Sequence, residues 1–187
     1  PYSIGLMLFA ATMAVFFIVY YFFGGVGYYD NSLIANAFVL PVLYCGAAFL
    51  SVHYVWKRKK MNFKEAFQRA FVPMFVGGLL SIISIFAFLN FVDPGAKDIL
   101  NHQFVERNRN ELTEIYTKEK GRLKSEKEKA ALEKEYLKSL QSFSQDQVKG
   151  KDMLTFRHFA TYFGVILLFY VVLSVFFGAF FRTKNLE

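Results

Sequence analysis

The stretch that decides the fold runs from Phe159 to Phe181 and reads FATYFGVILLFYVVLSVFFGAFF, without a single Asp, Glu, Lys or Arg. Three other stretches have the same character: Ile4 to Phe23, Leu33 to Trp56 and Phe71 to Val92. About 20 apolar residues in an α-helix cover the roughly 30 Å hydrocarbon core of a bilayer. The sequence therefore predicts an all-α integral membrane protein with four transmembrane helices.

Composition divides the chain of 187 residues into a membrane part and a polar part. Its hydrophobic content of 55%, with 24 Phe, is concentrated in the four stretches, whereas most charges lie between Asp93 and His158. We expect residues 1–92 to hold transmembrane helices one to three, residues 93–158 to form a charged insertion, and residues 159–187 to hold the fourth helix and a tail.

The short loops predict an orientation. Positive side chains gather at Lys57 to Lys60, Lys64 and Arg69, whereas the turn from Gly24 to Ser32 has a single charged residue, Asp30. Loops rich in Lys and Arg usually stay in the cytoplasm. We therefore expect the lysine loop inside the cell and the Gly24 to Ser32 turn outside.

The end of the chain indicates the same orientation, because Arg182 and Lys184 follow the fourth stretch. Both termini are then cytoplasmic, in a multi-pass protein of the bacterial cytoplasmic (inner) membrane. The insertion is then extracytoplasmic. Its many lysines are a weak counter-argument, since loops of about 60 residues or more largely escape the charge rule.

The lysine loop is also a candidate site of lipid or membrane anchoring. The residues in question are Trp56, Lys57, Arg58, Lys59 and Lys60. Four successive cations attract anionic lipid, although an ordinary anchored loop has the same composition. Just beyond them, Asn62 with Glu65 three positions later predicts a helix cap, and the spacing of apolar residues predicts a short interfacial helix near 62–70 that leads into the third span.

The insertion is predicted to be helical. Asp93-Pro94-Gly95 predicts a turn after the third span, and apolar residues recur at helical spacing from Ala96 to Lys120. Gly121 interrupts this pattern, and Ser125 with Glu128 predicts the cap of a second helix. Since the chain must return to the same face of the membrane, we expect an extracytoplasmic helical hairpin, with one long helix and an extended return as the alternative. Six apolar residues of the insertion form a candidate partner interface: Val105, Leu112, Ile115, Leu132, Tyr136 and Leu140.

Small residues and prolines indicate how the spans pack. Gly77 with Ser81, and Ser174 with Gly178, are small-residue pairs that suit close helix contact, either inside this bundle or against another subunit. Pro41 and Pro73 lie within the second and third spans, where each permits a kink.

The chemistry that the sequence lacks narrows the function. No Asp, Glu, Lys or Arg lies within a span, which disfavours ion-coupled transport, proton relays and intramembrane proteolysis. HExxH, GxxxxGK and G-x-S-x-G motifs do not occur, and the sole cysteine, Cys45, lies within a span. The 14 positive residues between Asp93 and His158 are offset by 12 acids, which argues against nucleic-acid binding. We expect no enzymatic activity, no cofactor and no metal.

The order of these features resembles a known family. The run Asn62-Phe63-Lys64-Glu65-Ala66-Phe67 precedes the third span, Phe91-Val92-Asp93-Pro94 ends it, a charged helical segment follows, and a span rich in Phe and Gly closes in basic residues. Over nearly its whole length the chain resembles a bacterial family known as a domain of unknown function, number four-one-nine-nine. The resemblance implies a four-span envelope protein and brings no catalytic residues.

These observations together predict a non-enzymatic inner-membrane accessory or scaffold protein. Its expected partners are membrane lipids and either another protein or a second copy of itself, bound through the helical insertion and the helix faces. The alternative is a carrier or channel for a lipid or small molecule, in which the kinked second and third spans line a path.

Overall fold

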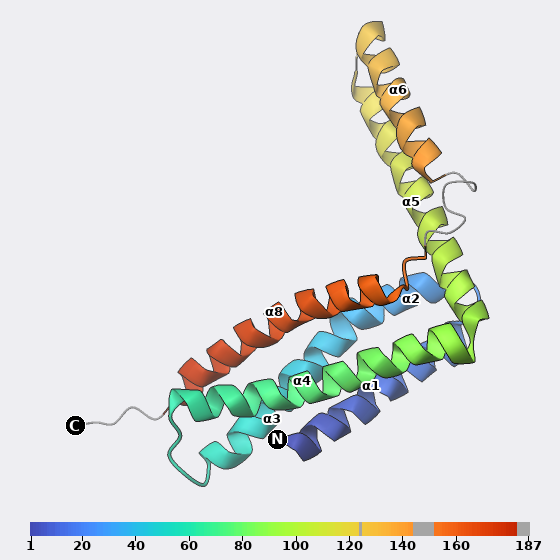
Figure 1. Cartoon of the computed structure of the whole chain (residues 1–187). Coiled ribbons are helices and arrows are strands. Elements are labelled where there is room, and N and C mark those ends of the chain that lie inside the picture. The colour runs from blue at the N-terminus through green and yellow to red at the C-terminus, as the bar shows by residue number, and fades with distance from the viewer. Residues whose placement is uncertain (124, 144–151, 183–187) are drawn as a thin grey trace.

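The structure is a computed structural model that describes residues 1–123, 125–143 and 152–182. Within these ranges every regular element is a helix. Helices α1 (Tyr2–Phe23), α3 (Leu40–Trp56), α4 (Phe63–Ala87) and α8 (Phe156–Phe181) lie side by side as a bundle, as Figure 1 shows. From one end of the bundle project α5 (Pro94–Arg122) and α6 (Glu126–Ser142), which we call the arm.

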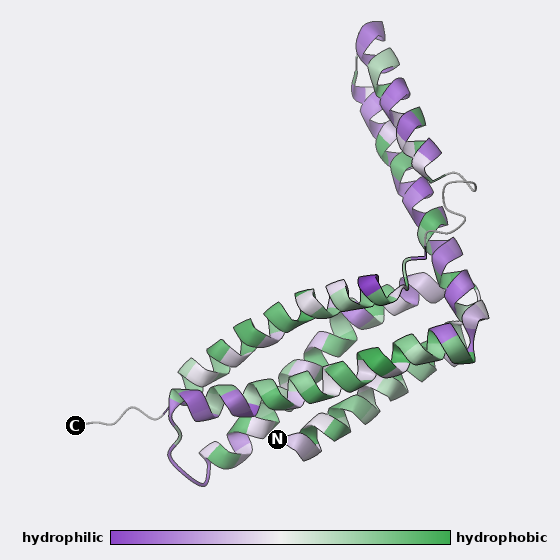
Figure 2. Ribbon diagram, in the orientation of Figure 1, coloured by the Kyte–Doolittle hydropathy of each residue, from purple (hydrophilic) through white to green (hydrophobic). Residues whose placement is uncertain are grey.

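Four helical segments are long and apolar enough to cross a membrane, as the sequence predicted. They are Tyr2–Phe23, Tyr28–Trp56, Phe63–Val92 and Phe156–Phe181. In Figure 2 the bundle is mainly hydrophobic and the arm is mainly hydrophilic. The all-α membrane-protein class therefore agrees with the structure.

The second span begins earlier than its predicted start at Leu33. It consists of α2 (Tyr28–Ile34), the π-helical turn η1 (Ala35–Val39) and α3 in direct succession. Polar residues are accommodated at its start because the Asn31 amide and the Ser32 hydroxyl donate to the carbonyls of Gly27 and Tyr28, at 2.9 and 2.7 Å. Their hydrogen bonds are satisfied within the helix, so the helix can include them.

Both π-helical turns lie where the α-helical hydrogen-bond pattern is disturbed. In η1 the Leu40 amide bonds to the Ala35 carbonyl, five positions back, immediately before Pro41. Proline has no N–H to offer the carbonyl one turn earlier, which favours a wider turn at this point. The second π-helical turn, η2 (Phe88–Val92), continues α4 to the end of the third span.

The cap predicted at Asn62 is confirmed. The Asn62 Oδ1 atom accepts a hydrogen bond from the Glu65 amide at 2.8 Å. The helix that begins there runs without a break to Ala87, so the predicted interfacial segment near 62–70 is the first part of α4.

Small residues bring the helices of the bundle close together. A Cβ atom on Gly77 would lie 3.0 Å from the Gly5 carbonyl and from Leu8 Cγ, so α4 and α1 nearly touch through their backbones. On another side, Gly78 faces the Tyr170 side chain of α8. Near the C-terminal end of α8, Gly178 faces the Phe63 ring of α4. The small residues thus serve packing inside this bundle.

The bundle interior also contains a short chain of hydroxyl groups. The Thr12 hydroxyl donates to the Leu8 carbonyl at 2.8 Å and lies 3.4 Å from the Tyr44 hydroxyl. The Tyr44 ring stacks on Tyr170, with 5.3 Å between the ring centres. The hydroxyl contact joins α1 to α3, and the ring stacking joins α3 to α8.

Asp93 redirects the chain from the bundle into the arm. Its carboxylate accepts a hydrogen bond from the Ala96 amide at 3.1 Å and Pro94 is the first residue of α5, so the predicted turn is a helix cap. From there α5 runs across the end of the bundle instead of continuing along α4, as Figure 1 shows. Ala96 and Leu100 at the base of α5 are buried in an apolar cluster with Tyr28, Leu89 and Phe159.

The two helices of the arm lie side by side in Figure 1. Their rings Tyr116 and Tyr136 stack at 4.2 Å, and the Tyr136 hydroxyl lies 3.1 Å from the Thr113 hydroxyl. The cap predicted at Ser125 is right in its position, because Ser125 directly precedes α6. It is wrong in its hydrogen bond, because the Ser125 side chain makes no capping bond. Residues 144–151, which follow the arm in the sequence, lie outside the described residues.

Candidate anchoring and interaction sites

Trp56, the first candidate anchoring residue, packs at the end of the bundle. Its ring meets Phe181 of α8 edge-on at 5.6 Å and lies near His53 at 6.0 Å. It remains 46% exposed, so one side holds α3 against α8 while the other faces outward. Since Trp is common at the boundaries of membranes, this exposure suits the predicted anchoring role, which stays a prediction.

The basic residues after Trp56 have different surroundings. The Arg58 guanidinium lies over the Tyr54 ring at 4.1 Å, and the Lys59 ammonium forms a 2.7 Å ion pair with Glu65. Lys57 and Lys60 are exposed. The ion pair ties the loop to the first turn of α4, so the basic residues stay together at one end of the bundle. Their role toward lipid stays a prediction. Lys184, on which the predicted orientation also rests, lies outside the described residues.

The candidate partner residues do not form one face. Tyr136 faces α5, and Leu132 and Leu140 lie one turn on either side of it, all half-buried. On α5, Leu112 is half-buried one turn before Tyr116, whereas Ile115 is 53% exposed and points away from this contact. Val105, nearer the bundle, is half-buried. The sequence pattern could not distinguish the residues at the contact between α5 and α6 from the residues on the exposed surface of the arm.

Two polar contacts fix the base of the arm. In the first, the Tyr20 hydroxyl of α1 donates to Asp93 Oδ2 at 2.6 Å. This bond and the one from the Ala96 amide lower the pKa of Asp93 below its ordinary value of 3.8. The same carboxylate therefore binds the membrane bundle and caps the arm.

In the second contact, the Asp152 carboxylate accepts hydrogen bonds from α5 and from the segment that leads into α8. Lys97 Nζ lies 2.9 Å from its carboxylate, the Asn101 amide 3.0 Å and the Leu154 N–H 2.7 Å. Burial alone would raise the pKa of Asp152, but the hydrogen bonds outweigh burial and lower the pKa. This polar cluster joins α5 to the residues that lead into α8. Its members are too far apart in the sequence for local spacing to reveal it.

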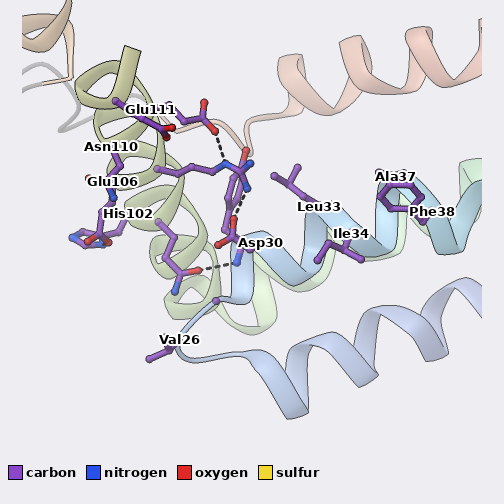
Figure 3. Close-up of a pocket in the computed structure, with 15 residues that line it drawn as sticks. Val26, Asp30, Leu33, Ile34, Ala37, Phe38, His102, Glu106, Asn110 and Glu111 are labelled. Carbon is purple, nitrogen blue, oxygen red and sulfur yellow. Dashed lines mark hydrogen bonds and ion pairs between the residues drawn. The ribbon is translucent and has the colours of Figure 1, made fainter. Parts of the chain in front are cut away.

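An open groove of about 860 Å³ lies between α2, η1 and α5. Figure 3 shows that α5 supplies a polar wall, including His102, Glu106 and Asn110, whereas Leu33 and Phe38 come from the second span. The groove was not predicted, because its two walls come from segments far apart in the chain. The apolar wall was visible in the sequence only as part of a hydrophobic run.

Hydrogen bonds hold the two walls of the groove together. The Arg107 guanidinium bonds to Asp30 and, at 2.9 Å, to Glu111. Gln103 accepts a bond from the Tyr29 amide at 2.8 Å and donates to the Gly25 carbonyl at 2.7 Å. These bonds hold α5 against the start of the second span and so fix the position of the polar wall relative to the apolar wall. Among the described residues, no group of three or more His, Cys, Asp or Glu side chains is placed to hold a metal ion.

In the part of the chain that the structure describes, four helices are long and apolar enough to cross a membrane and a polar helical arm follows the third, which is the architecture of a multi-pass membrane protein. The chain belongs to the family described as "Protein of unknown function (DUF4199)", whose model matches residues 4–183. This match confirms the family that the sequence resembled. No curated protein and no solved structure shows significant similarity to the chain.

Proposed function

We propose that this protein is a non-enzymatic accessory or scaffold protein of the bacterial cytoplasmic membrane, which binds a protein partner or a second copy of itself through the arm. The observation that carries the proposal is the exposure of α6. None of its residues, from Glu126 to Ser142, is buried. Among the described residues α6 packs mainly on α5, which leaves most of its surface available to a partner.

Apolar side chains on the outside of the arm support this function. Ile115 on α5 and Leu137 on α6 are 53% and 52% exposed. The contacts within the arm are few, and ordering each residue costs about 1–2 kcal/mol of backbone entropy. The arm gains stability from its attachment to the bundle, and a bound partner would supply more.

The base of the arm suits the presentation of a surface. The Tyr20–Asp93 bond attaches the arm to α1, and the Lys97–Asp152 ion pair attaches it to the segment before α8. Two attachments at different points restrict rotation of α5 about its own end. The arm therefore keeps one direction relative to the membrane.

The proposed placement follows the charge distribution of the loops. The lysine loop between α3 and α4 lies at the opposite end of the bundle from the arm (Figure 1). With that loop in the cytoplasm, both termini are cytoplasmic and the arm is extracytoplasmic. A partner would then meet the arm outside the membrane.

The alternative of a carrier or channel between the second and third spans receives less support. It requires a polar cavity between α3 and α4. The groove described above lies instead between the start of the second span and α5. We therefore prefer the scaffold function.

Purification in mild detergent from the native host tests the proposal, with light scattering to measure the mass of the complex. We expect a species heavier than one chain. Replacing Ile115 and Leu137 by Glu should release the single chain, because charges would enter the apolar part of the interface. Replacing the exposed residues Thr117 and Gln141 by Glu adds the same two charges and should leave the complex intact. A single chain in the unaltered protein, or a complex insensitive to the first pair, would contradict the proposal.

A further inference from the structure

We propose that the groove between α2, η1 and α5 binds a membrane phospholipid with a primary-amine headgroup, such as phosphatidylethanolamine. This inference goes beyond the scaffold function and does not depend on it. It rests on the shape, depth and charge of the groove.

The apolar wall of the groove is the outer surface of a membrane span. Ile34 is 55% exposed and Phe38 is 70% exposed. Both line the groove and both lie within the segment Tyr28–Trp56, which is apolar enough to cross a bilayer. In a membrane such side chains contact acyl chains. Acyl chains therefore occupy the part of the groove that these apolar side chains line, whatever headgroup the lipid carries.

The polar wall lies at the depth of the headgroups. Because α5 runs across the end of the bundle, its side chains stand above the first turns of α2 (Figure 3). Gly25, just before the second span, bonds to Gln103 of α5, and Asp30, at the start of that span, bonds to Arg107 of α5. These two bonds fix the position of α5 relative to the second span. A phospholipid with its acyl chains against Phe38 would place its headgroup beside α5.

The charges of the polar wall select the headgroup. Besides His102, its ionisable residues are Glu106, Glu111, Glu114 and Arg107, and Asp30 and Tyr29 line the groove from α2. Two of the carboxylates, Asp30 and Glu111, share Arg107, and Lys118 binds Glu114 at 2.6 Å. These residues, with Lys118 included, carry four negative and two positive charges, so the wall is still negative and repels an anionic headgroup.

Glu106 is the carboxylate best placed for a cation. Its side chain is 63% exposed, and its neighbour His102 lies 3.9 Å away. A primary ammonium donates up to three hydrogen bonds to carboxylates and amide oxygens, including that of Asn110. A choline headgroup carries the same charge but has no N–H to donate. The wall should therefore prefer ethanolamine to choline.

Native mass spectrometry of the full chain in mild detergent tests the proposal. The probe is an equimolar mixture of phosphatidylethanolamine, phosphatidylcholine and phosphatidylglycerol with identical acyl chains. We expect the bound lipid to be enriched about fivefold in phosphatidylethanolamine over each of the others, as expected for one charged contact near a membrane surface. Equal retention of the three lipids, or a preference for phosphatidylglycerol, would overturn the proposal.

Three variants locate the lipid. Glu106→Gln should abolish the enrichment, whereas Glu119→Gln, which removes an exposed carboxylate of the same helix outside the groove, should retain it. Ala37→Trp fills the exposed apolar wall and should reduce retention of all three lipids. Wild-type enrichment in Glu106→Gln, or wild-type retention in Ala37→Trp, would show that the lipid binds elsewhere.

A competitor separates a lipid site from a site for free amines. Glycerophosphoethanolamine carries the headgroup without acyl chains and should not displace the lipid at equal concentration. Displacement by this compound would show that the groove recognises a soluble amine, which contradicts the proposed contact with acyl chains.

Discussion

The hydroxyl of Tyr20 donates a 2.6 Å hydrogen bond to the carboxylate of Asp93, and the other oxygen of that carboxylate caps α5. Tyr20 lies near the end of the first span, and Asp93 is the first residue after the third. A single carboxylate thus couples the packing of the membrane helices to the direction of the arm.

Removing this carboxylate should loosen the base of the arm. In Asp93→Ala, hydrogen exchange at the amides of the first turn of α5 should accelerate, because the Ala96 amide loses its acceptor. Asp93→Asn keeps an acceptor for the cap and should have a smaller effect. Unchanged exchange at Ala96 in the alanine variant would contradict the role of the cap.

The same carboxylate predicts a pH dependence. Its folded pKa is lowered, so its contribution to stability is present above the unfolded value near 3.8 and is lost as the pH falls through the folded value. Tyr20→Phe removes one of the bonds that lower the pKa, and the pKa of Asp93 should rise. Carboxyl NMR of the protein in detergent micelles would measure it, and a pKa unaffected by Tyr20→Phe would show that the bond is not formed.

Asp152 should stabilise the joint between the arm and α8. Its side chain is 25% exposed, and its removal takes the ion-pair partner from Lys97, which keeps its 3.1 Å bond to Asn90 Oδ1, and the acceptor from the Asn101 amide. We expect Asp152→Ala to cost about 1–2 kcal/mol of unfolding free energy, measured by denaturant titration in detergent. Asp98→Ala, at an exposed position of α5, should be neutral. Equal effects of the two substitutions would remove the special role of Asp152.

The close packing of the bundle predicts which glycines tolerate a side chain. A Cβ atom on Gly78 would collide with the Tyr170 hydroxyl and lie 3.0 Å from a ring carbon, whereas one on Gly164 has open space. Gly78→Ala should cost about 1–3 kcal/mol, as overpacking usually does. Gly164→Ala should cost nothing or stabilise α8. Thermal unfolding in detergent compares them, and equal melting temperatures would argue against the tight contact between α4 and α8.

The arm should depend on its attachments. A peptide of residues 96–143 lacks the bonds through Asp93 and Asp152 and retains few internal apolar contacts, the Tyr116–Tyr136 pair among them. Its circular dichroism should show partial helix with a broad melt. A cooperative melt from a fully helical state would show that the arm folds by itself, and the main reason to propose a partner would disappear.

The sequence could predict what depends on local pattern. The charge-free stretches predicted the four spans, and the spacing of Asn62 and Glu65 predicted the cap of α4, because a cap involves neighbours in the chain. The small residues predicted close packing, although not the helices that they would contact. Ser125 shows the limit of this reasoning, since its pattern matches a cap whose side-chain bond does not form.

The rest depends on contacts between distant segments. Asn101 and Asp152 meet only after α5 has turned across the bundle, and the groove appears only when α5 lies above η1. Periodicity also could not decide that Ile115 points outward while Leu112 lies on the side of the Tyr116–Tyr136 contact. At Pro41 the sequence predicted only that a kink is permitted, and the structure has a π-helical turn just before this residue.

The central claim is that four helices cross the membrane and leave the arm outside the cell and the lysine loop inside. With Cys45 replaced by Ala, single cysteines at Ser125 and Lys60 can be probed with an impermeant thiol reagent added to intact cells. Both positions are exposed in the structure, so accessibility reports the side of the membrane. We predict labelling at Ser125 from outside and labelling at Lys60 only after the membrane is opened. Labelling of Lys60 in intact cells, with Ser125 protected until lysis, would contradict the account.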